Sequence, residues 1–147
     1  MNAKQAPRSI QHPAFVLFAI CISLLSVPIL AHHGSAISYE TQLEKAISMK
    51  GTVTEFVWKN PHCYILYNVK DASGKVVEWS AETSSPSSMT GEHGWSRTTV
   101  KAGDELTFTV LPSKISTSAG LLYKLVAADG KVLLEDKSRL RQDPSQQ

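Results

Sequence analysis

Alternating apolar and polar residues along the chain predict a series of β-strands. The clearest alternation lies at 105–110, where three apolar residues share one face and three polar residues share the other. Residues 47–58 also alternate, but their phase changes near Thr54 or Glu55, which predicts a β-bulge at that point. The other predicted strands are 62–69, 76–82, 121–128 and 131–134.

A segment rich in serine, 84–95, separates the third predicted strand from the fourth. Pro86 can open one or two helical turns that Ser84 or Ser85 would cap, so we predict a short helix there. Three meandering strands, a short helix and two or three further strands are typical of an OB-like barrel. We therefore predict an all-β fold with one short helix, a small OB-like five- to six-stranded barrel, and keep an open two-sheet sandwich as the alternative.

The pattern also divides the chain into segments. The barrel is expected to span 47–136, with Trp79 and Phe108 on inward faces of one core. Residues 32–46 would form an N-terminal segment, and 137–147 a disordered tail, because the only apolar residue after Lys137 is Leu140.

Residues 1–31 have the layout of a secretory signal. Lys4 and Arg8 precede an uncharged apolar stretch, 14–30, which is marginal in length for a membrane span. We predict a signal peptide cleaved after Ala31, with Ala36 as the alternative site and a retained anchor as the alternative fate. The mature protein would then be periplasmic or secreted, with no stable membrane association after cleavage.

The charge of the chain and its lack of known motifs disfavour two classes of function. The chain carries fifteen Lys and Arg and thirteen Asp and Glu. Lys4 and Arg8 lie in the predicted signal, so thirteen of each remain in the body and leave it without the positive excess that nucleic acid binding needs. No phosphate-binding loop, nucleophile elbow or paired-cysteine motif occurs, which favours a protein that is not an enzyme.

The chain has two cysteines, and Cys21 would leave with the signal. Cys63 alone cannot close an internal disulfide in an oxidising compartment. Three interpretations stay open for Cys63: a buried inert residue, a metal ligand, or a site of intermolecular pairing.

Two histidines stand at the predicted start of the mature protein. Cleavage after Ala31 would make His32 the N-terminal residue, so its α-amino and ring nitrogens, together with His33, would suit Cu(II). The alternative is a tail with two solvated histidines.

Other candidate residues lie at the predicted rim of the barrel. His62 follows Asn60-Pro61 at a strand corner, where it would join His32 and His33 as a metal ligand or only hydrogen-bond to Asn60. His93, Trp58 and Trp95 are the further candidates for a ligand-binding rim, although Trp95 also suits a plug for the barrel end.

Several short motifs resemble one family of exported bacterial proteins. His32-His33-Gly34-Ser35, Asn60-Pro61-His62 and Gly94-Trp95-Ser96-Arg97 look like the corresponding segments of the domain-of-unknown-function family 6152. The resemblance spans about Ala31 to Leu134, and it implies export and one small β-domain without supplying an activity.

Three hypotheses for the function follow. The first is an exported binding or accessory module that holds a metal ion, with copper as the candidate, or a small ligand at the barrel rim, or docks on another periplasmic protein. The second is a redox enzyme with an N-terminal histidine copper site. The third is an interaction domain without a ligand.

Overall fold

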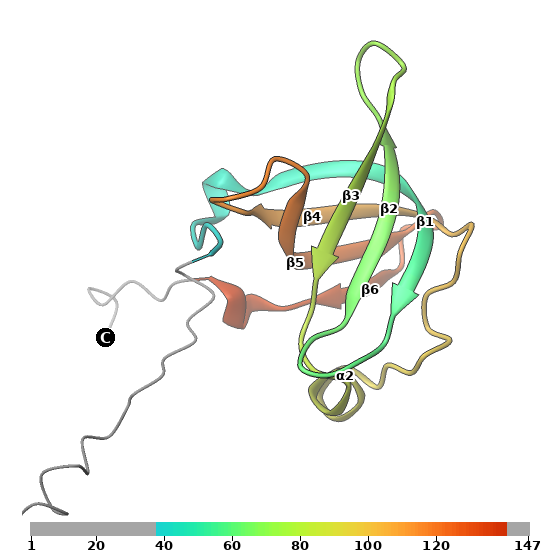
Figure 1. Ribbon diagram of the computed structural model, residues 1–147. Coiled ribbons are helices and arrows are strands. Elements are labelled where there is room, and N and C mark those ends of the chain that lie inside the picture. Colours follow the sequence, from blue (N-terminus) through green and yellow to red (C-terminus); the bar gives the residue numbers. More distant parts are fainter. Residues whose placement is uncertain (1–37, 141–147) are drawn as a thin grey trace, which may run out of the picture. The chain divides into compact units, whose positions relative to one another are not determined.

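Four antiparallel strand pairings and one parallel pairing close a β-barrel in the computed structural model, which describes residues 38–140 (Figure 1). The sheet order is β3-β2-β1-β4-β5-β6, and a parallel pairing of β3 with β5 closes the barrel and leaves β6 as an outer strand. The predicted OB-like barrel with one short helix is confirmed, and the open sandwich is not formed. The strands are β1 (Ile47–Val57), β2 (Tyr64–Lys70), β3 (Val76–Glu82), β4 (Glu105–Pro112), β5 (Ala119–Ala127) and β6 (Val132–Glu135).

The long strand β1 pairs with β2 along its second half and with β4 along its first half. Its register against β2 shifts between Val53 and Glu55, which confirms the predicted bulge. Gly51 lies where β1 passes close to β2, since a Cβ atom there would come 2.6 Å from the Tyr67 ring. The bulge and the close approach let one strand bend enough to serve both halves of the barrel.

Small residues lie at the seam where the barrel closes. Ala81 of β3 pairs with Gly120 of β5, and a Cβ atom on Gly120 would lie only 2.7 Å from the Cβ atom of Val110. A larger residue at this position would therefore push β5 away from β4.

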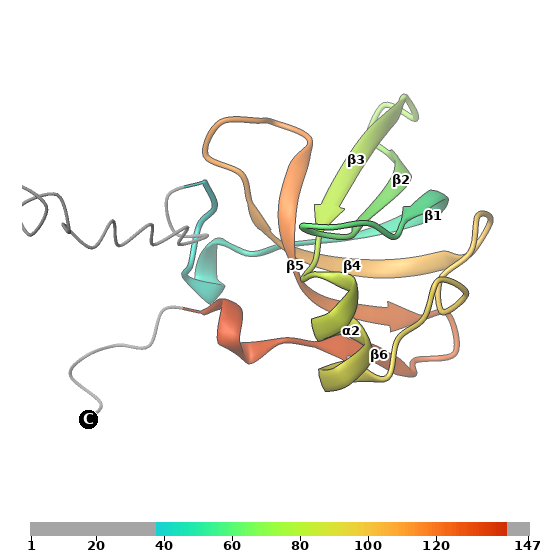
Figure 2. The same cartoon turned by 60° about the horizontal axis from the view of Figure 1, so that its bottom comes forward.

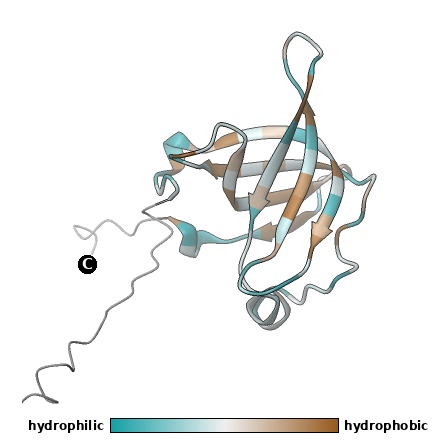
Figure 3. Cartoon of the chain, viewed as in Figure 1, coloured by the Kyte–Doolittle hydropathy of each residue, from teal (hydrophilic) through white to brown (hydrophobic). Residues whose placement is uncertain are grey.

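The main core fills the interior of the barrel. The rings of Tyr67 and Phe108 stack at its centre, with centroids 3.7 Å apart and planes 4° from parallel. Phe108 is fully buried and Trp79 is half-buried against the same cluster, so both belong to one core, as predicted. Figure 3 shows the matching brown, hydrophobic stretches on the barrel strands.

The helix α2 (Pro86–His93) lies near one end of the barrel, as the turned view in Figure 2 shows. Ser85 caps its N-terminus by accepting a hydrogen bond from the amide of Ser88, and Pro86 occupies its first turn. The predicted helix within 84–95 is confirmed. None of the helices in residues 38–140 has both the length and the apolar character to cross a membrane.

Both ends of the described chain pack on the outside of the barrel. Tyr39 forms an isolated bridge with Ser113, and the 3-10 helix η2 (Leu43–Lys45) leads into β1. Tyr39 and Leu140 pack with Ala46 against a second, smaller core of Leu111, Leu121 and Tyr123.

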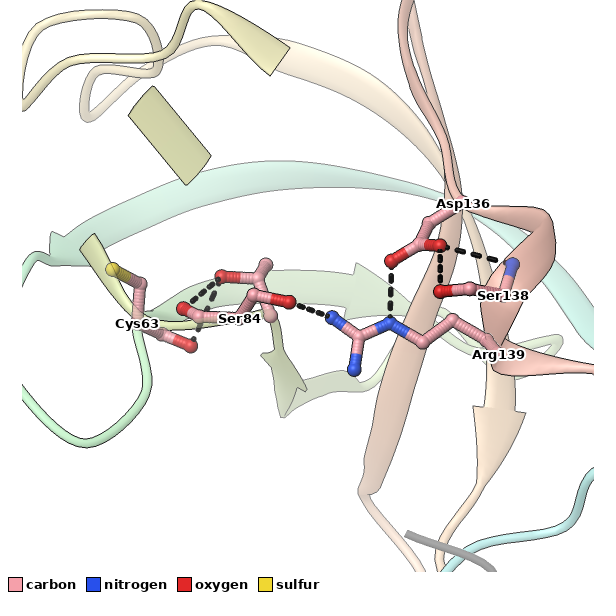
Figure 4. Close-up of polar contacts among 6 residues, drawn as sticks. Cys63, Ser84, Asp136, Ser138 and Arg139 are labelled. Carbon is pink, nitrogen blue, oxygen red and sulfur yellow. Dashed lines mark hydrogen bonds and ion pairs between the residues drawn. The ribbon is translucent and has the colours of Figure 1, made fainter. Parts of the chain in front are cut away.

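The residues after β6 differ in part from expectation. The sequence predicts disorder from Lys137 onward, yet Lys137–Arg139 forms the 3-10 helix η3. Asp136 caps η3, and Arg139 donates hydrogen bonds to both Asp136 and Ser84 (Figure 4). These contacts hold a segment with almost no apolar residues on the barrel. The rest of the predicted tail, 141–147, and the predicted signal peptide, 1–31, lie outside the described residues.

Candidate functional site

His62 lies at the corner between β1 and β2, directly after the cis peptide bond Asn60–Pro61. Backbone hydrogen bonds extend the β2–β3 ladder past this corner: the Cys63 amide donates to the Ser84 carbonyl over 3.0 Å, and the Thr83 amide donates to the Cys63 carbonyl over 2.8 Å. The Thr83 hydroxyl also donates to the Cys63 carbonyl. The backbone beside His62 is therefore held to the end of β3.

The His62 ring contacts the last residue of β3. Its Nδ1 lies 2.7 Å from Oε1 of Glu82, while 47% of the His62 side chain and 15% of the Glu82 side chain stay exposed. Tyr64 pairs directly with Glu82 in the β2–β3 register, so His62, two residues before Tyr64, lies on the same face.

A tyrosine from the N-terminal segment occupies the other oxygen of the same carboxylate. The Tyr39 hydroxyl donates to Oε2 of Glu82 over 2.7 Å. Burial, followed by the hydrogen bond to Glu82, raises the pKa of Tyr39 far above its ordinary value. Burial and the nearby Glu82 charge also raise the pKa of Tyr64. Both phenols therefore stay protonated at neutral pH, and Tyr39 remains a donor.

This arrangement, the His62 corner of Tyr39, His62, Tyr64 and Glu82, leaves one atom free for a ligand. An ionised carboxylate only accepts hydrogen bonds, so Nδ1 of His62 must carry a proton to bind Glu82. In the neutral ring, Nε2 then keeps its lone pair. A histidine that donates its other ring nitrogen to a carboxylate is the usual form of a metal-binding histidine in proteins.

The described residues do not form a complete metal site. No group of three or more His, Cys, Asp and Glu side chains that could hold a metal ion occurs within residues 38–140. His32 and His33, the other predicted metal ligands, lie outside the described residues.

Cys63 is fully buried and free, and burial raises the pKa of its thiol. A buried, protonated thiol fits the inert interpretation among the three that the sequence leaves open.

The other predicted ligand-binding residues have different surroundings. Trp95 is 3% exposed and its indole Nε1 donates to the Leu133 carbonyl over 3.0 Å, as expected of a plug. Phe56 packs edge-to-face between Trp58 and Trp95, with ring centroids 5.4 and 5.9 Å apart. The Nε2 atom of His93 is buried without a hydrogen-bond partner among the described residues.

These residues do not gather around His62. Within residues 38–140, no hydrogen bond, ion pair or ring contact joins His62 to His93, Trp58 or Trp95. Their role in ligand binding stays a prediction.

Sequence reasoning missed two members of the His62 corner. The position of Glu82 could have been inferred from the sequence. If the predicted strand 76–82 pairs antiparallel to the strand 62–69, its last residue lies beside the first residue of the other strand. The sequence has no such signal for Tyr39, because this residue precedes the first predicted strand and contacts Glu82 only through the tertiary fold.

Comparison with known protein families identifies the family of this chain. Residues 20–123 match the sequence profile of a family described as a family of unknown function, DUF6152. The chain belongs to this family. The matched range includes every residue of the His62 corner and both N-terminal histidines, and it ends before Asp136. Neither a curated protein nor a solved structure matches the chain.

Proposed function

We propose that this protein is an exported binding module that takes up Cu(II) at the His62 corner, with His32 and His33 supplying the remaining nitrogen ligands. The observation that carries the proposal is the 2.7 Å contact between His62 Nδ1 and Glu82, which orients the ring while 47% of the His62 side chain stays exposed.

Tyr39 supports the convergence of the three histidines. Its hydroxyl is bound to the same carboxylate as His62, so the described chain begins close to the corner. His33 precedes Tyr39 by six residues, which span at most about 20 Å when extended. The proposal requires that this stretch of chain bring His33 and His32 to the His62 ring.

The donor set favours copper over other common metal ions. Imidazole and amine nitrogens suit Cu(II), which also binds such ligands more tightly than the other divalent first-row metals do. Magnesium and calcium prefer oxygen ligands, and the corner offers only a carboxylate that is already bound to His62 and Tyr39.

Copper titration of three forms tests the proposal. The forms are the mature chain beginning at His32, the same chain with His62→Ala, and a chain beginning at Ser35; His93→Gln in the mature chain is the control. We expect one saturable site in the mature and control forms and a loss of affinity of tenfold or more in the other two, because each lacks part of a shared ligand set.

Each other outcome contradicts a defined part of the proposal. A loss of copper affinity only in the chain that begins at Ser35 means that the N-terminal histidines bind copper without His62, as in the redox-enzyme hypothesis. Absence of saturable uptake in the mature chain overturns copper binding and favours an interaction domain that docks on another periplasmic protein.

Export has its own test. N-terminal sequencing of the periplasmic fraction is expected to give His32 as the first residue. A start at Ile37, or an intact residue 1 in the membrane fraction, overturns the N-terminal part of the copper site.

A further inference from the structure

A groove of about 770 Å³ lies on the barrel away from the His62 corner and shares no residue with it. Residues of β1, β2, β4 and β5 line this groove, together with Val76 at the start of β3. Figure 1 shows the β2–β3 hairpin standing out from the barrel. The volume lies in the range of sites that bind small molecules in proteins.

Two lysines line this groove on neighbouring strands. Thr52 of β1 pairs with Asn68 of β2, and Lys50 and Lys70 each lie two residues beyond that pair on the same face of their strand. Both lysines are exposed, and neither forms an ion pair within residues 38–140. Elsewhere the sheet does pair its charges across strands, as in Lys124 and Glu135, whose charged atoms lie 3.2 Å apart.

Like charges on neighbouring strands repel each other, so Lys50 and Lys70 together favour an opposite charge between them. An anionic group between them would relieve this repulsion and accept charge-assisted hydrogen bonds from both ammonium groups. The side chains of Thr52 and Asn68 add polar groups beside this position.

The rest of the groove suits an apolar group. Val76 pairs with Lys70 in the β2–β3 register and is 51% exposed, so its methyl groups lie beside the charged position. Val126 and Ala127 of β5 line the groove as well. Glu105 is the one carboxylate among the lining residues, and it would disfavour a second anionic group at its end of the groove.

We propose that this groove binds a small organic anion whose carboxylate or phosphate group lies on Lys50 and Lys70 and whose apolar part packs against Val76. The proposal concerns a site separate from the copper site, and neither depends on the other.

Three probes test the chemistry: hexanoate, hexyl phosphate and inorganic phosphate, each titrated at constant ionic strength. The readout is the shift of the backbone amide signals of Thr52 and Asn68 in two-dimensional NMR spectra of the mature protein. We expect saturable shifts with hexanoate, hexyl phosphate or both, and the tighter of the two identifies the anionic group. Inorganic phosphate is expected to bind more weakly than hexyl phosphate, because it lacks the apolar part.

Surface variants identify the residues that bind. The double variant Lys50→Gln with Lys70→Gln is expected to weaken binding by about tenfold or more, while Lys101→Gln, outside the groove, leaves it unchanged. Val76→Ser should weaken the binding of hexyl phosphate and leave the binding of inorganic phosphate unchanged. Glu105→Gln should tighten the binding of both.

Two results would overturn the proposal. One is the absence of saturable shifts with both alkyl anions. The other is equal binding by the double lysine variant and the unmodified protein, which would mean adventitious contact of the probes with the surface.

Discussion

Two polar contacts of the same length have different surroundings in this barrel. At the His62 corner, Nδ1 of His62 lies 2.7 Å from Glu82, and at the C-terminal end, Nε of Arg139 lies 2.7 Å from Asp136. Their exposure differs: 47% of the His62 side chain is accessible, but only 15% of the Arg139 side chain. The distance alone therefore does not tell a binding site from a structural contact.

The difference lies in what remains free after each pair has formed. Asp136 also accepts hydrogen bonds from the amide and hydroxyl of Ser138, and Arg139 also donates to Ser84, which ties η3 to the chain before α2 (Figure 4). At the His62 corner, Tyr39 and His62 occupy both oxygens of Glu82, yet the half-exposed His62 ring has a second nitrogen, Nε2, that the contact with Glu82 does not use. We infer that the C-terminal pair stabilises the fold and that the His62 pair orients a ligand atom.

The largest predicted effect is on the C-terminal pair. Arg139→Met removes the partner of a buried carboxylate, so we expect the free energy of unfolding to fall by about 3 kcal/mol. Chemical denaturation measures this loss. Lys124→Met is the matched control, because Lys124 and Glu135 are each about one-third exposed, so solvent screens their attraction and we expect a much smaller loss. Equal losses in the two variants would contradict the structural role of Arg139.

Acid should weaken the same pair. Burial acts to raise the pKa of Asp136, but the hydrogen bonds from Ser138 and the charge of Arg139 outweigh it and hold the pKa below its ordinary value. A depressed carboxyl pKa stabilises the fold above the unfolded value of about 3.9, and this stabilisation is lost as the pH falls through the folded value.

The variant Asp136→Asn isolates this contribution. Its free energy of unfolding should fall less steeply than that of the unmodified protein between about pH 5 and pH 2, because it has no carboxyl group to protonate at this position. Denaturation curves at a series of pH values measure both slopes. Parallel slopes would show that Asp136 does not carry this acid sensitivity.

The smallest predicted effect on stability is at the His62 corner. His62→Gln removes a half-exposed partner of Glu82, so we expect a loss of about 1 kcal/mol or less. Chemical denaturation beside Arg139→Met gives the comparison directly. A loss as large as that of Arg139→Met would mean that His62, too, serves the fold.

The barrel could be predicted from sequence because its strands carry local signals. The phase change near Thr54 predicts the bulge, and the serines with Pro86 predict α2. Each signal depends on neighbouring residues, which is why the order of elements was sufficient to identify an OB-like fold.

The long-range contacts that Tyr39 and Arg139 make lacked such signals. Tyr39 and Glu82 are 43 residues apart, and Arg139 and Ser84 are 55 residues apart, so only the folded chain brings them together. The C-terminal segment looked disordered because it has almost no apolar residues, whereas its hydrogen bonds with Asp136 and Ser84 hold it in place. His62 could be identified as a candidate from Asn60-Pro61, but the partner that orients its ring could not.

Paramagnetic broadening by copper tests the central claim most directly. Substoichiometric Cu(II) is added to the isotope-labelled mature protein, and the NMR signals of His62, Tyr64 and Glu82 are compared with those of His93 and of Asp71 and Lys75 in the turn at the far end of β2. The account predicts that the signals of His62 and its neighbours disappear first, while the signals of the turn and of His93 persist. Broadening that spares His62, or that affects all histidines equally, would contradict a copper site at the His62 corner.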